Sequence, residues 1–93
     1  MTREEAYSLV DLERFYQDGK WGGEEHDSKH NVADWIIFME IYLDRAKAAV
    51  HSTGKREAME QILKVTALGV ACMESQLEDG EMIGHYSNPE VNF

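Results

Sequence analysis

Residues 32–50, VADWIIFMEIYLDRAKAAV, carry the apolar pattern that decides the fold class. One set of apolar residues recurs in steps of three and four, the spacing of one helix face: Ile36, Met39, Leu43, Ala46 and Val50. A second apolar strip lies beside the first and consists of Trp35, Phe38, Tyr42 and Ala49. The sequence therefore predicts a helix over 32–50 that is contacted on more than one side.

Helices are also expected on both sides of this segment, over about residues 3–18 and 55–79. Thr2 and Glu5 have the spacing of a capping box at the start of the first of these helices. Gly80 stands where the last helix would end. The single proline of the chain lies beyond all three segments, so no strong helix breaker interrupts them.

The segments between and after these helices have other patterns. Residues 19–30 contain three glycines, many charges and no apolar period, which predicts an ordered Gly-rich loop anchored by Trp21. Asn31, with Asp34 three residues later, would cap the helix that follows. Residues 81–93 contain a turn-forming Ser-Asn-Pro and are expected to form a C-terminal arm.

Small residues in the last helix suggest how the helices pack. Ala67, Gly69 and Ala71 would permit close approach of a neighbouring helix, and antiparallel packing on helix 32–50 is the simplest arrangement. The sequence therefore predicts an all-α protein. We expect a small antiparallel helical bundle of about three helices, forming a single domain over residues 1–93.

Composition limits the class of partner. Eighteen acidic residues against nine Lys and Arg give a formal net charge of -9, so duplex nucleic acid is not expected as a ligand. No segment has the roughly twenty apolar residues of a membrane span, and the N-terminus lacks a signal-peptide pattern. A cytoplasmic location is expected, in the host cell if the chain is viral. A homo-oligomer is expected because so small a domain buries a modest fraction of its surface.

Acidic residues on helix 32–50 are candidates for metal binding. Glu40, Asp44, Lys47 and His51 follow one another at helical steps and share one face. Two carboxylates one turn apart can share a hard cation through their oxygen atoms, so Glu40 and Asp44 are candidate ligands for Mg²⁺. The alternative is an ordinary polar face with ion pairs along the helix.

Two other groups of residues are less suggestive of chemistry. His26 and His30 are four residues apart, but in a loop this spacing gives the rings no common direction, so zinc binding is not expected. Cys72 lies in an apolar run, where a thiol usually behaves as a small buried hydrophobic group. The sequence contains no phosphate-binding glycine motif and no nucleophile beside a base.

A family resemblance adds a functional expectation. Residues 12–27, LERFYQDGKWGGEEHD, combine an arginine, a glutamine three residues later and Lys-Trp-Gly, and further similarities follow at Asp34-Trp35 and over 64–68. This pattern resembles small phage and bacterial proteins related to the MazG-like all-α nucleotide pyrophosphohydrolases. The resemblance implies an oligomeric helical bundle that binds a nucleoside triphosphate and holds magnesium on acidic clusters of two long helices.

The chain departs from those acidic clusters. The family's first cluster has two adjacent glutamates and another three residues later; Glu40 and Asp44 match its ends, but Ile41 stands in the middle. Its second cluster, a Glu and an Asp three apart, falls on Gln61 and Lys64. A lysine cannot coordinate magnesium and repels it, so binding without efficient hydrolysis is expected.

The leading hypothesis is a phage-type protein that binds or sequesters a phosphorylated nucleotide-type ligand, such as a host immune signal, in an anti-defence role. No catalytic residue is assigned. The candidate ligand contacts are cationic or aromatic: Arg14, Lys20, Trp21, His26, Lys29 and His30. One alternative is a magnesium-dependent nucleoside triphosphate pyrophosphohydrolase, in which a shifted register supplies Glu40, Asp44, Glu57 and Glu60. Another is an acidic protein that inhibits a host defence complex.

Overall fold

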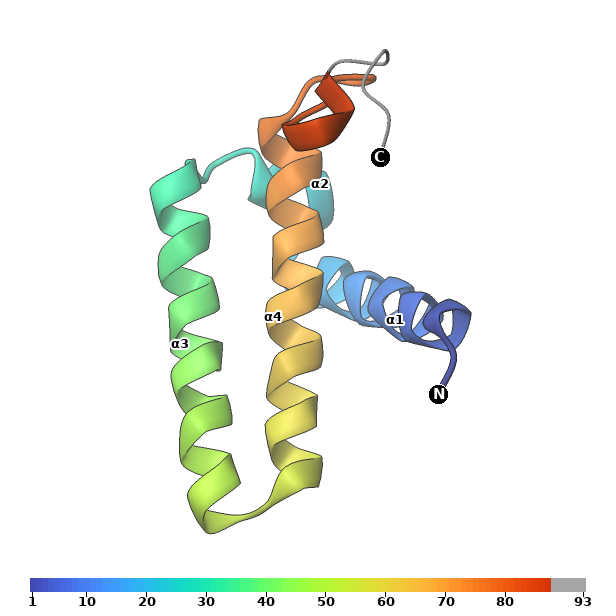
Figure 1. Ribbon diagram of the computed structural model, residues 1–93. Helices are drawn as coiled ribbons and strands as arrows, with labels where there is room; N and C mark the ends of the chain where they lie inside the picture. The colour runs from blue at the N-terminus through green and yellow to red at the C-terminus, as the bar shows by residue number, and fades with distance from the viewer. Residues whose placement is uncertain (88–93) are drawn as a thin grey trace.

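The computed structural model describes residues 1–87 as an all-α arrangement, without strands in that part of the chain (Figure 1). The helices, in order, are α1 (Arg3–Trp21), α2 (Gly23–Asp27), α3 (Val32–Ser52), α4 (Lys55–Gln76) and the 3-10 turn η1 (Gly84–Ser87). Helices α3 and α4 form an antiparallel hairpin, whereas α1 projects to one side of α4. The predicted all-α class and the pairing of the two long helices are confirmed.

The segment between the first two long helices differs from its prediction. Helix α1 continues to Trp21, and α2 occupies residues 23–27, so most of the predicted loop 19–30 is helical. Gly22 separates the two helices with a φ of 99°, a left-handed conformation that glycine adopts without steric strain. The chain therefore contains a short additional helix where the sequence indicated a loop.

The C-terminal boundary also shifts. Helix α4 ends at Gln76, before the predicted end at residue 79, and its last turn is closed by a bond from the N–H of Leu77 to the carbonyl of Met73. Of the predicted arm 81–93, residues 81–83 have no regular secondary structure, residues 84–87 form η1, and residues 88–93 lie outside the described residues. None of the helices within residues 1–87 has an apolar stretch long enough to cross a membrane.

Side chains cap two helices as the sequence predicts. The Thr2 hydroxyl accepts from the Glu5 N–H at 3.1 Å, and the Glu5 carboxylate accepts from the Thr2 N–H at 3.1 Å. Asn31 and Asp34 make the same reciprocal pair, with distances of 2.9 and 3.0 Å. Each pair satisfies two backbone N–H groups, one on the capping residue and one in the first helical turn.

The core is small and lies along the α3–α4 hairpin. Trp35, Leu68 and Ala71 form its centre, each no more than 2% exposed. Five partly buried side chains pack against this centre: Trp21, Phe38, Met39, Tyr42 and Cys72. Ala67 is fully buried on α4. The small side chains of Ala67 and Ala71 allow the axes of α3 and α4 to approach closely.

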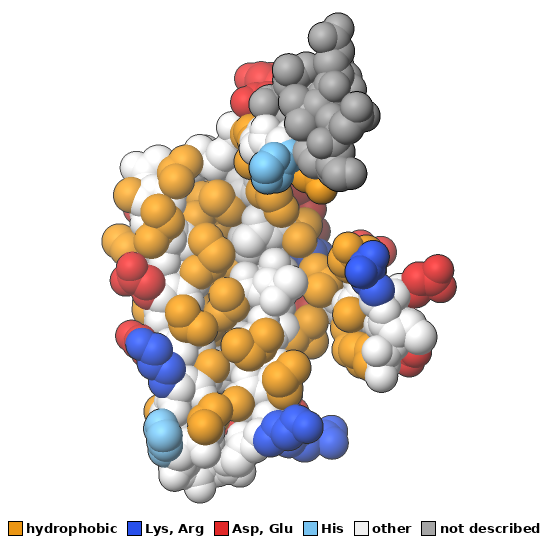
Figure 2. Space-filling model, in the orientation of Figure 1, with side chains coloured by type: hydrophobic (Ala, Val, Ile, Leu, Met, Phe, Trp, Pro, Cys, Tyr) orange, Lys and Arg blue, Asp and Glu red, His pale blue; other side chains and the backbone are white. Residues whose placement is uncertain are grey.

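Of the two apolar strips on α3, the first is largely exposed, and the second, which includes Trp35, is the more buried. Three exposed members of the first stripe are Ile36, Leu43 and Val50. On α4 the corresponding exposed residues are Met59, Ile62 and Met73. Hydrophobic side chains are spread over both long helices on the face seen in Figure 2. We call the six exposed residues named above, three on α3 and three on α4, the apolar stripe.

Candidate functional site: an aromatic pocket with a cationic edge

A cavity of about 300 Å³ opens beside the core. Its lining residues come from all four α-helices: Trp21, His26, Trp35, Phe38, Ile41, Tyr42, Arg45 and Leu68. We call it the aromatic pocket. An apolar, ring-rich lining with a few polar groups is typical of small-molecule sites.

The sequence places these rings together by helical spacing and by one turn. Trp35, Phe38 and Tyr42 follow one another in steps of three and four, so they share one face of α3. The turn at Gly22 brings the rings of Trp21 and His26 into a stacked arrangement, with centroids 6.3 Å apart and planes inclined by 26°. The pocket is therefore formed by one face of α3 and by the junction of α1 and α2.

Three cations lie beside the aromatic rings. The Arg45 guanidinium carbon is 4.9 Å from the centroid of the Tyr42 ring, and Lys64 Nζ of α4 is 5.5 Å from the same centroid. Lys20 Nζ is 5.5 Å from the Trp21 ring. Within residues 1–87, none of the three cations has a carboxylate at ion-pair distance. Their charges therefore remain available to an anion, despite the net charge of -9.

One buried polar atom on α3 and one on α4 have no hydrogen-bond partner in the described part of the chain. One is Nε1 of Trp35, which lines the aromatic pocket and is 2% exposed; the other is Oε1 of Gln61, one turn before Lys64 on α4. A buried donor or acceptor without a partner costs about 1–3 kcal/mol. A ligand in the aromatic pocket that accepted a hydrogen bond from Trp35 Nε1 would recover part of this cost.

The two candidate histidines meet, contrary to the expectation from a loop. The ring of His26 in α2 and the ring of His30, after the turn that follows α2, lie 4.7 Å apart, and their Nε2 atoms are separated by 3.4 Å. The other ring nitrogen of each histidine faces a carboxylate: His26 Nδ1 is 3.3 Å from Asp27 and His30 Nδ1 is 3.6 Å from Asp34. Four polar side chains thus form a continuous row beside the aromatic pocket.

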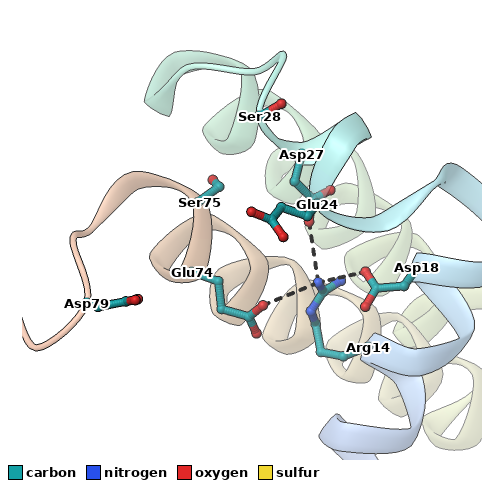
Figure 3. Close-up of a pocket in the computed structure, with 8 residues that line it drawn as sticks. All are labelled: Arg14, Asp18, Glu24, Asp27, Ser28, Glu74, Ser75 and Asp79. Carbon is teal, nitrogen blue, oxygen red and sulfur yellow. Dashed lines mark hydrogen bonds and ion pairs between the residues drawn. The ribbon is translucent and has the colours of Figure 1, made fainter.

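Arg14, a candidate ligand contact, lies elsewhere and is surrounded by acids (Figure 3). Its Nη2 atom is 2.8 Å from Asp18, 3.4 Å from Asp27 and 3.7 Å from Glu74. The cavity beside it, about 630 Å³, is also lined by Glu24 and Asp79. Because five carboxylates and one guanidinium line it, this larger cavity would repel a phosphate. The geometry therefore favours a structural role for Arg14.

The remaining candidates lie on the surface. Lys29 is exposed in the turn after α2, Glu40 and Asp44 are exposed on α3, and Glu57 and Glu60 are exposed on α4. Among residues 1–87, no group of three or more His, Cys, Asp or Glu side chains is placed to hold a metal ion. The structure thus gathers Lys20, Trp21, His26 and His30 at one site and leaves the candidate acidic ligands dispersed.

Sequence reasoning missed the α3 and α4 side chains of the aromatic pocket. The available signal was the helical spacing of Trp35, Phe38, Tyr42 and Arg45, which continues a strip of rings into a cation. Cys72 packs against the core as expected; burial raises the pKa of its thiol, which keeps it protonated and poorly nucleophilic at neutral pH.

Comparisons with known proteins add no family to this geometry, because no family model matches the chain and no curated protein or solved structure is significantly similar to it.

Proposed function

We propose that this protein binds a phosphorylated nucleotide-type ligand in the aromatic pocket and does not hydrolyse it. The observation that carries the proposal is the placement of two cations, Arg45 and Lys64, over the Tyr42 ring at a pocket lined by tryptophans; neither cation has an ion-pair partner among residues 1–87. A base can stack on the aromatic side chains while its phosphates meet the cations. Lys20, beside Trp21, would add a third positive charge.

The family resemblance supports this assignment if the family's first acidic cluster is aligned one residue later in the chain, on residues that line the aromatic pocket. In the family, the first acidic cluster is an adjacent pair and a third residue three positions later, facing a second cluster on the other long helix. In this chain the residues at that spacing in the aromatic pocket are Ile41, Tyr42 and Arg45, and Lys64 of α4 lies opposite them. We propose that two cations replace carboxylates in an inherited nucleotide site.

This replacement would change the chemistry of the site. A family enzyme needs magnesium to bridge the phosphates and activate water, and carboxylates hold the metal. Arg45 and Lys64 would repel a magnesium ion but bind phosphate oxygens directly. The proposed outcome is retention of the nucleotide without bond cleavage. A protein with these properties could withdraw a nucleotide signal from its receptor, which fits a phage-type, anti-defence role.

The proposal includes a homo-oligomer assembled through the apolar stripe. The stripe covers both long helices and includes Val50, 60% exposed, and Met59, 54% exposed. Leu43, Val50, Met59 and Ile62 also border a groove of about 490 Å³ between the helices. Exposed apolar residues that follow one helical face are typical of an interface with another helix. Two hairpins packed through this stripe would form a four-helix bundle.

The test is calorimetric titration with nucleoside mono-, di- and triphosphates and cyclic nucleotides, with and without Mg²⁺. We expect binding of at least one class without a requirement for Mg²⁺, and no release of pyrophosphate or phosphate on prolonged incubation. Magnesium-dependent release of pyrophosphate would establish the enzyme alternative instead. Absence of affinity for every class would remove the nucleotide proposal and favour the protein inhibitor.

A further inference from the structure

Two ring nitrogens face each other at the centre of the row that consists of Asp27, His26, His30 and Asp34. His26 Nε2 and His30 Nε2 face each other at 3.4 Å, longer than the usual nitrogen hydrogen bond of about 2.7–3.2 Å. The rings are held in place: His30 makes edge contacts with Trp35 and Phe38, at centroid distances of 5.9 and 5.0 Å. The facing nitrogens are therefore fixed by packing as well as by their own contact.

The carboxylates at both ends of the row decide where the ring protons lie. Asp27 Oδ1 is 3.3 Å from His26 Nδ1, and Asp34 Oδ2 is 3.6 Å from His30 Nδ1. A carboxylate favours the tautomer that carries its proton on the facing Nδ1: Asp27 acts through a hydrogen bond, and Asp34, which is beyond hydrogen-bond distance, acts through its charge alone. In two neutral rings of this kind both Nε2 atoms carry lone pairs, and these lone pairs face each other. Such a pair repels unless a positive charge lies between its members.

The spacing fits a metal ion as that positive charge. Histidine nitrogens bind zinc at about 2.0–2.1 Å, so two nitrogens at a tetrahedral ion lie about 3.3 Å apart. The observed separation of the two Nε2 atoms is 3.4 Å. A carboxylate on the other ring nitrogen is also the usual partner of a metal-bound histidine.

We propose that His26 and His30 bind one divalent transition-metal ion of the zinc class through their Nε2 atoms, with Asp27 and Asp34 orienting the rings. No third His, Cys, Asp or Glu within residues 1–87 is placed to complete the site, so the other positions take water or ligand oxygens. His26 lines the aromatic pocket, so an ion on its ring would be close to a ligand bound there. The metal site requires no nucleotide and is independent of the function proposed above.

The experiment uses untagged protein, because an added histidine tag would bind the same ions. Calorimetry with Zn²⁺ is expected to show one ion per chain, and Co²⁺ is expected to give the visible absorption of a tetrahedral centre. Mg²⁺ should show no binding at this site because it prefers oxygen ligands. His26→Ala and His30→Ala should each abolish the Co²⁺ spectrum.

The control is His51→Ala, since His51 is exposed on α3 and outside the row. This variant should bind Zn²⁺ like the parent. Asp34→Asn keeps a side-chain oxygen that can accept from the Asn31 N–H at the start of α3 and should weaken Zn²⁺ binding by about 10–100-fold. Circular dichroism of every variant checks that the helices are retained. His26→Gln and His30→Gln serve if either alanine variant fails to fold.

Two results would overturn the proposal. One is failure of the folded parent to bind Zn²⁺ and Co²⁺. The other is Zn²⁺ binding with an unchanged Co²⁺ spectrum in folded variants of both His26 and His30, which would place the ion elsewhere in the chain.

Discussion

Arg14 of α1 and Asp27 of α2 form an ion pair in which Nη2 and Oδ2 are 3.4 Å apart and the side chains are only 9% and 11% exposed. The pair joins the two helices across the turn at Gly22. Arg14 also donates through Nη1 to Gln17 Oε1 at 3.2 Å, and Gln17 is 1% exposed. One guanidinium thus pairs with Asp27 Oδ2 on α2 and with Gln17 Oε1 on α1, two oxygens of buried side chains.

We expect Arg14→Ala to lower the free energy of unfolding by about 3 kcal/mol or more, because it leaves Asp27 buried without a cation. Arg14→Lys should rescue little, since an ammonium cannot reproduce the planar fork that reaches Asp18 and Gln17 together. Urea unfolding followed by circular dichroism measures both changes. Arg3→Ala, at an exposed position on the same helix, is the control and should be nearly neutral.

The aromatic pocket leads to a binding prediction. Arg45→Glu and Lys64→Glu should each weaken nucleotide affinity at least tenfold, which corresponds to about 1.4 kcal/mol, because each replaces an attractive charge by a repulsive one. The matched control is Arg56→Glu, since Arg56 is 93% exposed at the start of α4 and outside the pocket lining. Equal losses in all three variants would indicate a response to net charge and no specific site.

The loop cations provide a second comparison at the same site. Lys20 lies over the Trp21 ring, whereas Lys29 is exposed in the turn after α2. We therefore expect Lys20→Glu to reduce nucleotide affinity more than Lys29→Glu, with helical circular dichroism unchanged in both. Titration calorimetry distinguishes them. If Lys29→Glu has the larger effect, the ligand lies over α2 and away from the aromatic pocket.

The features that sequence predicts well here are local. Thr2 with Glu5, and Asn31 with Asp34, specify helix starts through bonds within four residues, and both pairs form as expected. The spacing of apolar residues in 32–50 and 55–79 likewise predicts helices, because the geometry of a single helix fixes which of its residues share a face. The short α2 was missed because three glycines in residues 19–30 indicate a turn. In the structure two of these three, Gly22 and Gly23, adopt positive φ, whereas Gly19 is part of α1.

The features that sequence predicts poorly depend on which helices meet. Residues 32–50 carry two apolar strips, and their spacing does not tell which strip faces α4; in the structure Trp35 is buried and Ile36 is 47% exposed. The same ambiguity affected the site. Glu40 and Asp44 share a face of α3, but the face next to Lys64 carries Tyr42. The spacing within α3 alone therefore does not tell which of its faces meets α4, and the contacts proposed at the aromatic pocket could not be predicted from it.

Oligomer formation can be tested on the apolar stripe. Leu43→Glu combined with Ile62→Glu places two charges on residues that are 42% and 37% exposed, so we expect dissociation into folded monomers. Sedimentation velocity at several concentrations measures the change. Leu12→Glu, on α1 and 66% exposed, is the control and should leave the assembly intact. A parent protein that sediments as a monomer at high micromolar concentration would contradict this prediction.

The final prediction concerns Gly69, because the structure does not show the close helix contact that its small size suggested. The sequence suggested a close crossing there, but a methyl group added at Gly69 would meet only Met39 Sδ, at 3.9 Å, which is an ordinary contact. Ala67, which is fully buried, occupies the tighter position. We expect Gly69→Ala to stabilise the protein by about 0.5–1 kcal/mol through higher helix propensity. Ala67→Leu should destabilise it by about 1–3 kcal/mol through overpacking. Urea unfolding at two protein concentrations measures both changes and separates folding from assembly. If Gly69→Ala instead loses stability, and loses more at the higher concentration, the glycine lies against a second copy of the chain.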